Sequence, residues 1–200
     1  MTDLNTTRAT GLRDFFLATD HQEMRAACEG LYQSGWLPEL SQFDWREIEF
    51  AFNRLFIGPQ SPIAPPFASV YLEPEGYLMG ETTQFARRIY NLLGLKSPWE
   101  GQLPDDHISL ELDLCLHIRH AIVTTGFLYL QPIYEHFLQV HLQQWVPPFI
   151  GRIDGMKGLP KLISILGQQL NQWLETEIDW LNSRWLDNPE SPIHIEERHL

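Results

Sequence analysis

The sequence predicts an all-α fold, a compact bundle of many helices that form two lobes. Three observations support this prediction. In most segments apolar residues recur at spacings of three and four, which is the period of an amphipathic helix. Glycine and proline stand between these segments, where helices end. The one apolar run that alternates as a strand would, residues 108–118, is rich in leucine, a helix former.

The first half of the chain shows short periodic stretches around residues 12–16, over 22–33 and over 45–56. The last is the clearest, because its apolar residues fall on one face of a helix. Gly58 and Pro59 are expected to end this helix. The residues of its apolar face are Trp45, Ile48, Phe52, Leu55 and Phe56.

A proline-rich segment and a further helix follow. Residues 59–69 hold four prolines and no periodicity, so we expect an ordered loop there. Residues 82–93 return to a helical pattern, with Gly94 as the expected C-cap. Residues 96–104 carry two prolines and a glycine. They are the predicted hinge between the two lobes.

The second half is also expected to be helical. The segment from Ile108 is predicted to be a helix buried on most sides, with Asp105 or Asp106 as its N-cap. A second helix would hold Pro132 in its first turn and end at Pro147-Pro148. A last helix begins near Pro160 and carries apolar residues at helical spacing to residue 181.

Two hundred residues fit a single helical domain. Within this domain we expect an N-terminal lobe at about 1–95, the hinge at 96–104, a C-terminal lobe at 105–188 and a tail at 189–200. The hinge would allow two chains to exchange lobes. The expected oligomeric state is therefore a monomer or a swapped dimer.

The composition excludes some classes of function. The formal net charge is 14 − 26 = −12, so no nucleic-acid partner is expected, because phosphate binding needs clustered basic residues. The first residues lack the pattern of a signal peptide, and no apolar stretch reaches the roughly 20 residues of a membrane span. A cytoplasmic protein without stable membrane insertion is therefore expected. Cys28 and Cys115 are expected to be reduced, structural thiols.

The dipeptide Asp106-His107 admits three interpretations: a helix cap and anchor, a peptide or ligand contact, or half of a catalytic dyad. The cap is favoured, because no nucleophile motif accompanies the pair. His117 and His120 lie on one helix face, so a small helical metal-dependent enzyme using His107, His117 and His120 is an alternative hypothesis. His141 is expected to pack with its ring nitrogens satisfied.

The proline-rich loop suggests binding of a peptide. Pro65, Pro66, Phe67 and Tyr71 offer rigid apolar and aromatic surface at low entropic cost. The alternative is that Phe67 and Tyr71 only fix the loop to the core. The residues by themselves leave both interpretations open.

Five motifs in order give the chain a resemblance to a known family. They are Leu-Phe-x-Gly-Pro at 55–59, Pro-Pro-Phe-x-Ser-Val-Tyr at 65–71, Leu-Met-Gly-Glu-Thr at 78–82, Pro-x-Asp-His at 104–107 and His-Leu-x-x-Trp-x-x-x-Phe at 141–149. Together these resemble the TorD/DmsD family, the cytoplasmic chaperones that mature molybdenum-containing redox enzymes.

The resemblance implies an all-helical chaperone without enzyme activity. It would bind the twin-arginine leader or the apo catalytic subunit of a molybdoenzyme, assist cofactor insertion and delay export on the Tat pathway. No metal and no tightly bound cofactor are expected, although the resemblance admits contact with guanine nucleotide or the molybdenum cofactor. A chaperone of a leaderless cytoplasmic redox enzyme is a further alternative. Peptide-binding residues carried over from the family are Phe52, Leu55, Phe56, Pro59, Pro66, Phe67, Ser69, Gly80, Asp106 and His107, and the loop itself adds Tyr71.

The chain departs from the family pattern at several positions. The run usually rich in aromatic residues after the Asp-His motif is Asp-Leu-Cys-Leu-His at 113–117 here. Phe52 and Phe67 stand where many relatives have tryptophan, and Leu103 stands where a glutamate often opens the Asp-His motif. These departures put the identity of the client, rather than the family, in question.

Overall fold

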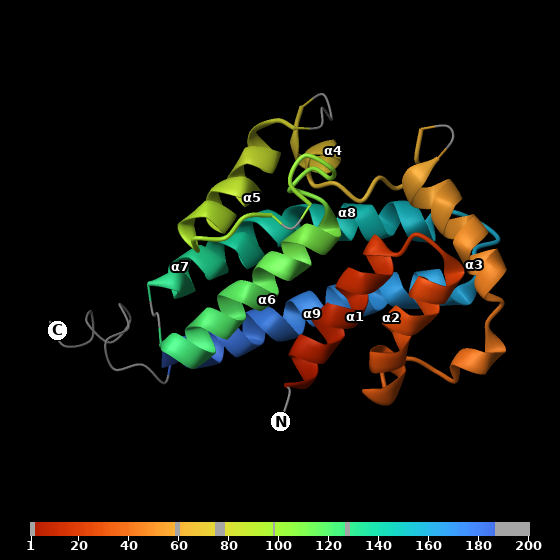
Figure 1. Cartoon of the computed structure of the whole chain (residues 1–200), viewed down its shortest axis with the longest axis horizontal. Coiled ribbons are helices and arrows are strands. Elements are labelled where there is room, and N and C mark those ends of the chain that lie inside the picture. Colours follow the sequence, from red (N-terminus) through yellow and green to blue (C-terminus); the bar gives the residue numbers. More distant parts are fainter. Residues whose placement is uncertain (1–2, 59–60, 75–78, 98, 127–128, 187–200) are drawn as a thin grey trace, which may run out of the picture.

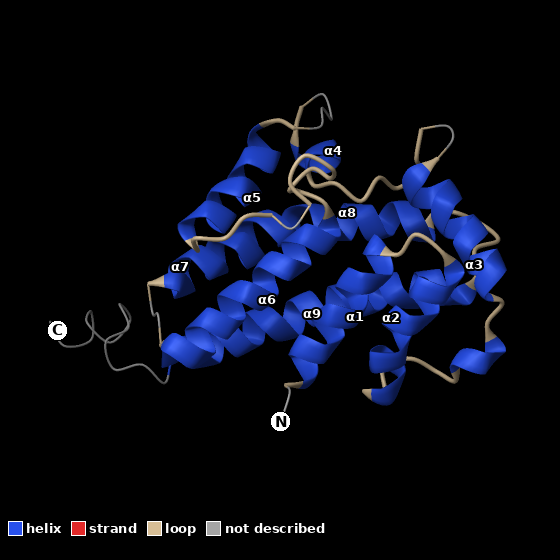
Figure 2. Ribbon diagram, viewed as in Figure 1, coloured by secondary structure: helices blue, strands red, loops and turns tan. Residues whose placement is uncertain are grey.

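The computed structural model describes residues 3–58, 61–74, 79–97, 99–126 and 129–186 (Figure 1). Over these ranges the chain is built from helices and loops, with no strand (Figure 2), so the predicted all-α class is confirmed. The helices are α1 Leu4–Leu17, α2 His21–Gln33, α3 Trp45–Phe52, α4 Ser69–Leu72, α5 Glu81–Leu92, α6 Ile108–Thr125, α7 Leu130–Glu135, α8 Gln143–Asp154 and α9 Lys161–Leu186. A 3-10 turn at Leu40–Gln42 and π-helical turns at Asn53–Ile57 (η2) and His136–Leu142 (η3) complete them.

The helices enclose one continuous apolar core. Helix α1 packs against α2, α6 and α9, while α8 packs against α9 and α4 (Figure 1). Phe15 and Ile48 from the first predicted lobe belong to the same cluster as Ile118 and Leu170 from the second. The predicted lobes thus share a core, and movement or exchange at residues 96–104 stays a prediction.

Helix α3 and the π-helical turn η2 follow the predicted amphipathic segment closely. The Asp44 carboxylate caps α3 by accepting hydrogen bonds from the N–H groups of Arg46 and Glu47. The chain leaves η2 at Gly58, whose φ of 99° lies in the left-handed region that favours glycine. All five residues of the predicted apolar face are buried.

Helix α6 confirms the choice of helix over strand at residues 108–118. Every residue from Ile108 to Cys115 is buried, as expected for a helix covered on most sides. The predicted N-cap was wrong. His107, rather than Asp105 or Asp106, caps the helix, because its Nδ1 accepts from the N–H of Ser109 while the Asp106 carboxylate bonds elsewhere.

The prediction that Pro147 and Pro148 end a helix was also wrong. Helix α8 continues through both prolines to Asp154. Their missing N–H groups leave the carbonyls of Gln143 and Gln144 without helical partners. These four residues lie on the exposed side of α8, so water can hydrate the two carbonyls. The packing of the buried side of the helix is therefore undisturbed.

The stretch predicted around residues 12–16 is the second half of the longer helix α1. Three further predicted elements agree with the structure. Helices α2, α5 and α9 occupy the predicted segments, and Gly94 has the left-handed φ of 71° expected after α5. The tail at 189–200 lies outside the described residues. None of the described helices combines the length and apolarity needed to cross a bilayer.

Candidate peptide-binding site

An apolar pocket of about 410 Å³ opens where the last turn of α1, the α3–η2 segment and the proline-rich loop meet. Five of the residues predicted from sequence line it: Phe52, Phe56, Pro66, Phe67 and His107. We call this cavity the aromatic pocket. The structure therefore brings together side chains from motifs that are about fifty residues apart in the sequence.

The floor of the aromatic pocket is a set of packed rings. Phe52 and Phe56 meet edge to face with their centroids 4.9 Å apart, and Phe56 meets Phe16 at 5.6 Å. These rings are almost fully buried, whereas Ile57 at the rim is 60% exposed. A fixed floor of this kind offers apolar contact at little cost in side-chain entropy.

The proline-rich loop and the Asp-His motif are joined directly. The N–H of Ala68 donates to the carbonyl of Asp106 at 3.0 Å, and the N–H of Ile108 donates to the carbonyl of Pro66 at 2.9 Å. Between these bonds the rings of Phe67 and His107 stand edge to face at 5.0 Å. One wall of the aromatic pocket is thus held in place by backbone hydrogen bonds.

His107 presents one defined tautomer to the aromatic pocket. Its Nδ1 accepts from the N–H of Ser109 at 3.2 Å, so in the neutral ring Nε2 carries the proton. Burial lowers the pKa of His107 to about 3, so the ring is neutral near pH 7. The imidazole can therefore donate a hydrogen bond from Nε2.

Replacing His107 by asparagine should weaken the dependence of stability on pH. Below pH 6.5 the unfolded chain takes up a proton at His107 and the folded chain does not, so stability falls as the pH drops. Asparagine caps helices well but does not titrate. Between pH 7.5 and 5.0 the wild type should lose about 2 kcal/mol more than His107→Asn in urea unfolding. Equal losses would show that His107 is protonated in the folded state.

Asp106 lies behind the aromatic pocket rather than in it. Its carboxylate is fully buried and accepts from the N–H of Ser69 at 2.9 Å and from Oγ1 of Thr83 at 2.7 Å. These bonds tie the starts of α4 and α6 to α5. In this arrangement Asp106 positions the loop and does not reach a ligand's arginines, and Ser69 is likewise buried.

The remaining predicted residues do not line the aromatic pocket. Leu55 is fully buried in the core, and Tyr71 stacks on Trp145 with centroids 5.7 Å apart. Gly80 faces the Glu73 carboxylate, where an added Cβ would lie 2.9 Å from an oxygen. Pro59 lies outside the described residues.

The histidines of the alternative metal hypothesis do not converge. His107 and His117 are ten residues apart along α6, which separates their backbones by about 15 Å. His117 instead pairs with Asp113 at 3.4 Å, and that bond raises the pKa of His117. Among the described residues no group of three or more His, Cys, Asp or Glu side chains could hold a metal ion.

The contribution of α1 to the site was not anticipated. Its last turn and the following corner, residues 16–19, form a side of the aromatic pocket. A signal existed in the sequence, because Asp20 with Glu23 three residues later marks a helix start and hence a corner just before it.

Two buried carboxylates were also missed. The expectation that His141 has satisfied ring nitrogens is supported by its Nε2, which lies 2.5 Å from Oε1 of Glu111, and Trp145 donates to the other Glu111 oxygen at 3.0 Å. Glu177 forms a second buried cluster with Arg119 and Tyr134. Nothing local marks either glutamate as buried, because their partners lie 30 or more residues away.

Known proteins resemble this chain in sequence and fold. A family model described as "Nitrate reductase delta subunit" matches residues 17–151. The TorD chaperone of Vibrio cholerae is 30% identical over 113 residues, which are 53% of this chain and 50% of that protein. The Tat proofreading chaperone DmsD of Salmonella typhi is 30% identical over 131 residues, 62% of this chain and 58% of the relative. The chain spans about half the length of the curated relatives that it matches.

A solved structure shares the fold. The crystal structure of a protein from Archaeoglobus fulgidus, assigned as a redox enzyme maturation protein, superposes with a TM-score of 0.52. The match covers 91% of this chain and 95% of that one at 18% identity. Identity at this level establishes the likeness of fold alone.

Proposed function

The chain belongs to the family of the nitrate reductase delta subunit and the TorD/DmsD chaperones, and on this basis we propose that it is a maturation chaperone rather than an enzyme. Its client is the apo catalytic subunit of a molybdenum-containing oxidoreductase. It binds the twin-arginine leader of that subunit in the cytoplasm and delays export while the cofactor is inserted. Contact with guanine nucleotide or the molybdenum cofactor is not part of the proposal.

The aromatic pocket is the observation that carries this proposal. A leader of this class contains an apolar segment, and the pocket offers an apolar floor with a rim that includes the exposed Ile57. Leu103, which stands where relatives often have glutamate, lies in the pocket wall and adds to its apolar character. Burial of apolar side chains in such a pocket supplies affinity at about 25 cal/mol per Å² before the costs of association.

Direct binding tests the proposal. The full chain would be titrated by calorimetry with twin-arginine leader peptides from molybdoenzymes of the same genome. Binding to one leader identifies the client. Absence of binding to every leader, with capture of an intact apo subunit, would favour a chaperone of a leaderless redox enzyme. Absence of both would contradict the chaperone proposal.

Phe67→Ala should weaken leader binding about tenfold or more while the fold survives. The Phe67 ring is partly exposed and forms a wall of the aromatic pocket, so its truncation removes contact area from the site. Fluorescence polarisation with a labelled leader measures the loss, and circular dichroism checks the fold. Phe50→Ala is the matched control, because Phe50 is 69% exposed and does not line the pocket. Equal affinities of Phe67→Ala and the wild type for the leader would show that Phe67 does not contribute to the binding site.

A further inference from the structure

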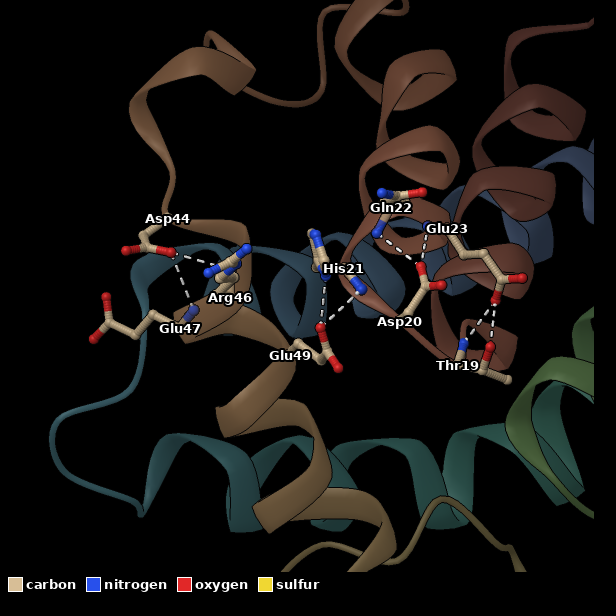
Figure 3. Close-up of polar contacts among 9 residues, drawn as sticks. All are labelled: Thr19, Asp20, His21, Gln22, Glu23, Asp44, Arg46, Glu47 and Glu49. Atoms are coloured by element: carbon tan, nitrogen blue, oxygen red, sulfur yellow. Dashed lines mark hydrogen bonds and ion pairs between the residues drawn. The ribbon is translucent and has the colours of Figure 1, made fainter.

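Three carboxylates stand at the corner beside the aromatic pocket, and we call Asp20, Glu23 and Glu49 the acidic corner (Figure 3). The link to the pocket is direct, because Thr19 lines the pocket and donates to Oε2 of Glu23 from both its N–H and its Oγ1, each at 2.8 Å. Asp20 follows Thr19 in the chain. Glu49 on α3 reaches the same corner through His21.

Each carboxylate of the acidic corner is held through one oxygen. Oδ1 of Asp20 accepts from the N–H groups of Gln22 and Glu23, and Oε2 of Glu49 accepts from the N–H and Nδ1 of His21. The second oxygen of Asp20, Glu23 and Glu49 has no hydrogen-bond partner in the part of the chain that the structure describes. The carboxylates are therefore oriented in advance and still able to accept, the arrangement that arginine recognition requires.

The end of α1 and the start of α2 meet at this corner. The carbonyl end of α1 carries partial negative charge and its last turn contains no basic residue, whereas the N-terminus of α2 carries partial positive charge that Asp20 and Glu23 offset. Of the neighbouring basic residues, His21 contacts Oε2 of Glu49, and Arg25 lies 4.0 Å from Glu29. The backbone N–H of Arg46 caps onto Asp44, and Arg46 lies away from Glu23 (Figure 3). An apolar pocket is thus bordered on one side by oriented acidic groups.

We propose that the acidic corner receives the paired arginines of the leader while the adjoining apolar segment occupies the aromatic pocket. The inference rests on the proposed function and gives the bound peptide a direction, with its basic end at the α1–α2 corner. It assigns arginine recognition to Glu23 and Glu49, because the Asp106 carboxylate is buried and already bonded. Charge complementarity beside an apolar contact sets the position of the bound peptide along the site as well as its affinity.

A double-mutant cycle tests the proposal on the full chain. The double variant Glu23→Gln/Glu49→Gln keeps acceptor oxygens for Thr19 and His21 but removes both charges. The probe is the twin-arginine leader that binds the wild type, together with the same peptide carrying glutamine in place of both arginines. The double variant should bind the arginine peptide at least tenfold more weakly. It should bind the glutamine peptide as the wild type does.

Glu47→Gln serves as the matched control. Glu47 is two residues from Glu49, about 200° around α3, and its side chain points away from the acidic corner (Figure 3). The control should bind the arginine peptide as the wild type does. If the double variant loses affinity equally for both peptides, or loses none, the acidic corner does not bind the arginines. Failure of the wild type to bind any leader would instead count against the proposed function.

Discussion

Replacing Glu177 by alanine is expected to lower the free energy of unfolding by about 3–5 kcal/mol. Glu177 is fully buried on α9. One of its oxygens accepts from the Tyr134 hydroxyl at 2.9 Å, and the other accepts from Arg119 at 2.5 Å and from Asn5. Without the carboxylate, the guanidinium of Arg119 stays buried with Asp3 as its remaining ionic partner. A buried charge that has lost its partner is among the most destabilising changes in a core.

Urea unfolding followed by circular dichroism measures this loss. Glu175→Ala is the matched control, because Glu175 lies two residues away on the same helix and is exposed. Its loss should change stability by no more than about 0.5 kcal/mol. A loss below about 1 kcal/mol for Glu177→Ala would mean that the cluster is open to water in solution.

Asp106→Ala is expected to lower the free energy of unfolding by about 3 kcal/mol. The change leaves the N–H of Ser69 and the hydroxyl of Thr83 buried without their charged acceptor. Because these bonds position the proline-rich loop against α6, leader binding should weaken as well, through displacement of Phe67. The effect on binding is therefore indirect.

The neighbouring residue provides the contrast. Asp105 pairs with Arg87 at 2.6 Å, but the Arg87 side chain is 47% exposed and returns to water when the partner is removed. Asp105→Ala should accordingly lose only about 1 kcal/mol. Thermal and urea unfolding of both variants distinguish the two residues. Equal losses would contradict a special structural role for Asp106.

Much of the fold was predictable because helices are encoded locally. The periodic apolar residues of segment 45–56 determine α3 and η2, and Gly58 marks the end at a left-handed φ. Leucine content separated helix from strand at residues 108–118. The errors occurred where tertiary contacts override local rules. Pro147 and Pro148 remain inside α8 because they lie on its exposed side.

The candidate site was predictable in part. Phe52, Phe56, Pro66, Phe67 and His107 were named from motifs, and they meet at the aromatic pocket. A structural anchor was the favoured interpretation of Asp106-His107, but the partners of Asp106 and the burial of Ser69 were not predictable, because they depend on helices that pack from elsewhere in the chain. The side formed by residues 16–19 was missed although Asp20 and Glu23 mark the start of α2, because this local signal places a corner in the chain but not its position beside the loop.

The sequence by itself determined the helical class, most helix boundaries and the apolar character of the residues at the pocket. Each of these depends on residues within one or two turns of each other. The tertiary structure alone decided which carboxylates are buried and which remain open to solvent. Asp106 and Glu177 bond to groups up to 172 residues away, while one oxygen each of Glu23 and Glu49 has no partner among the described residues. The energy of a charge depends on its solvation, and only the packed fold sets that solvation.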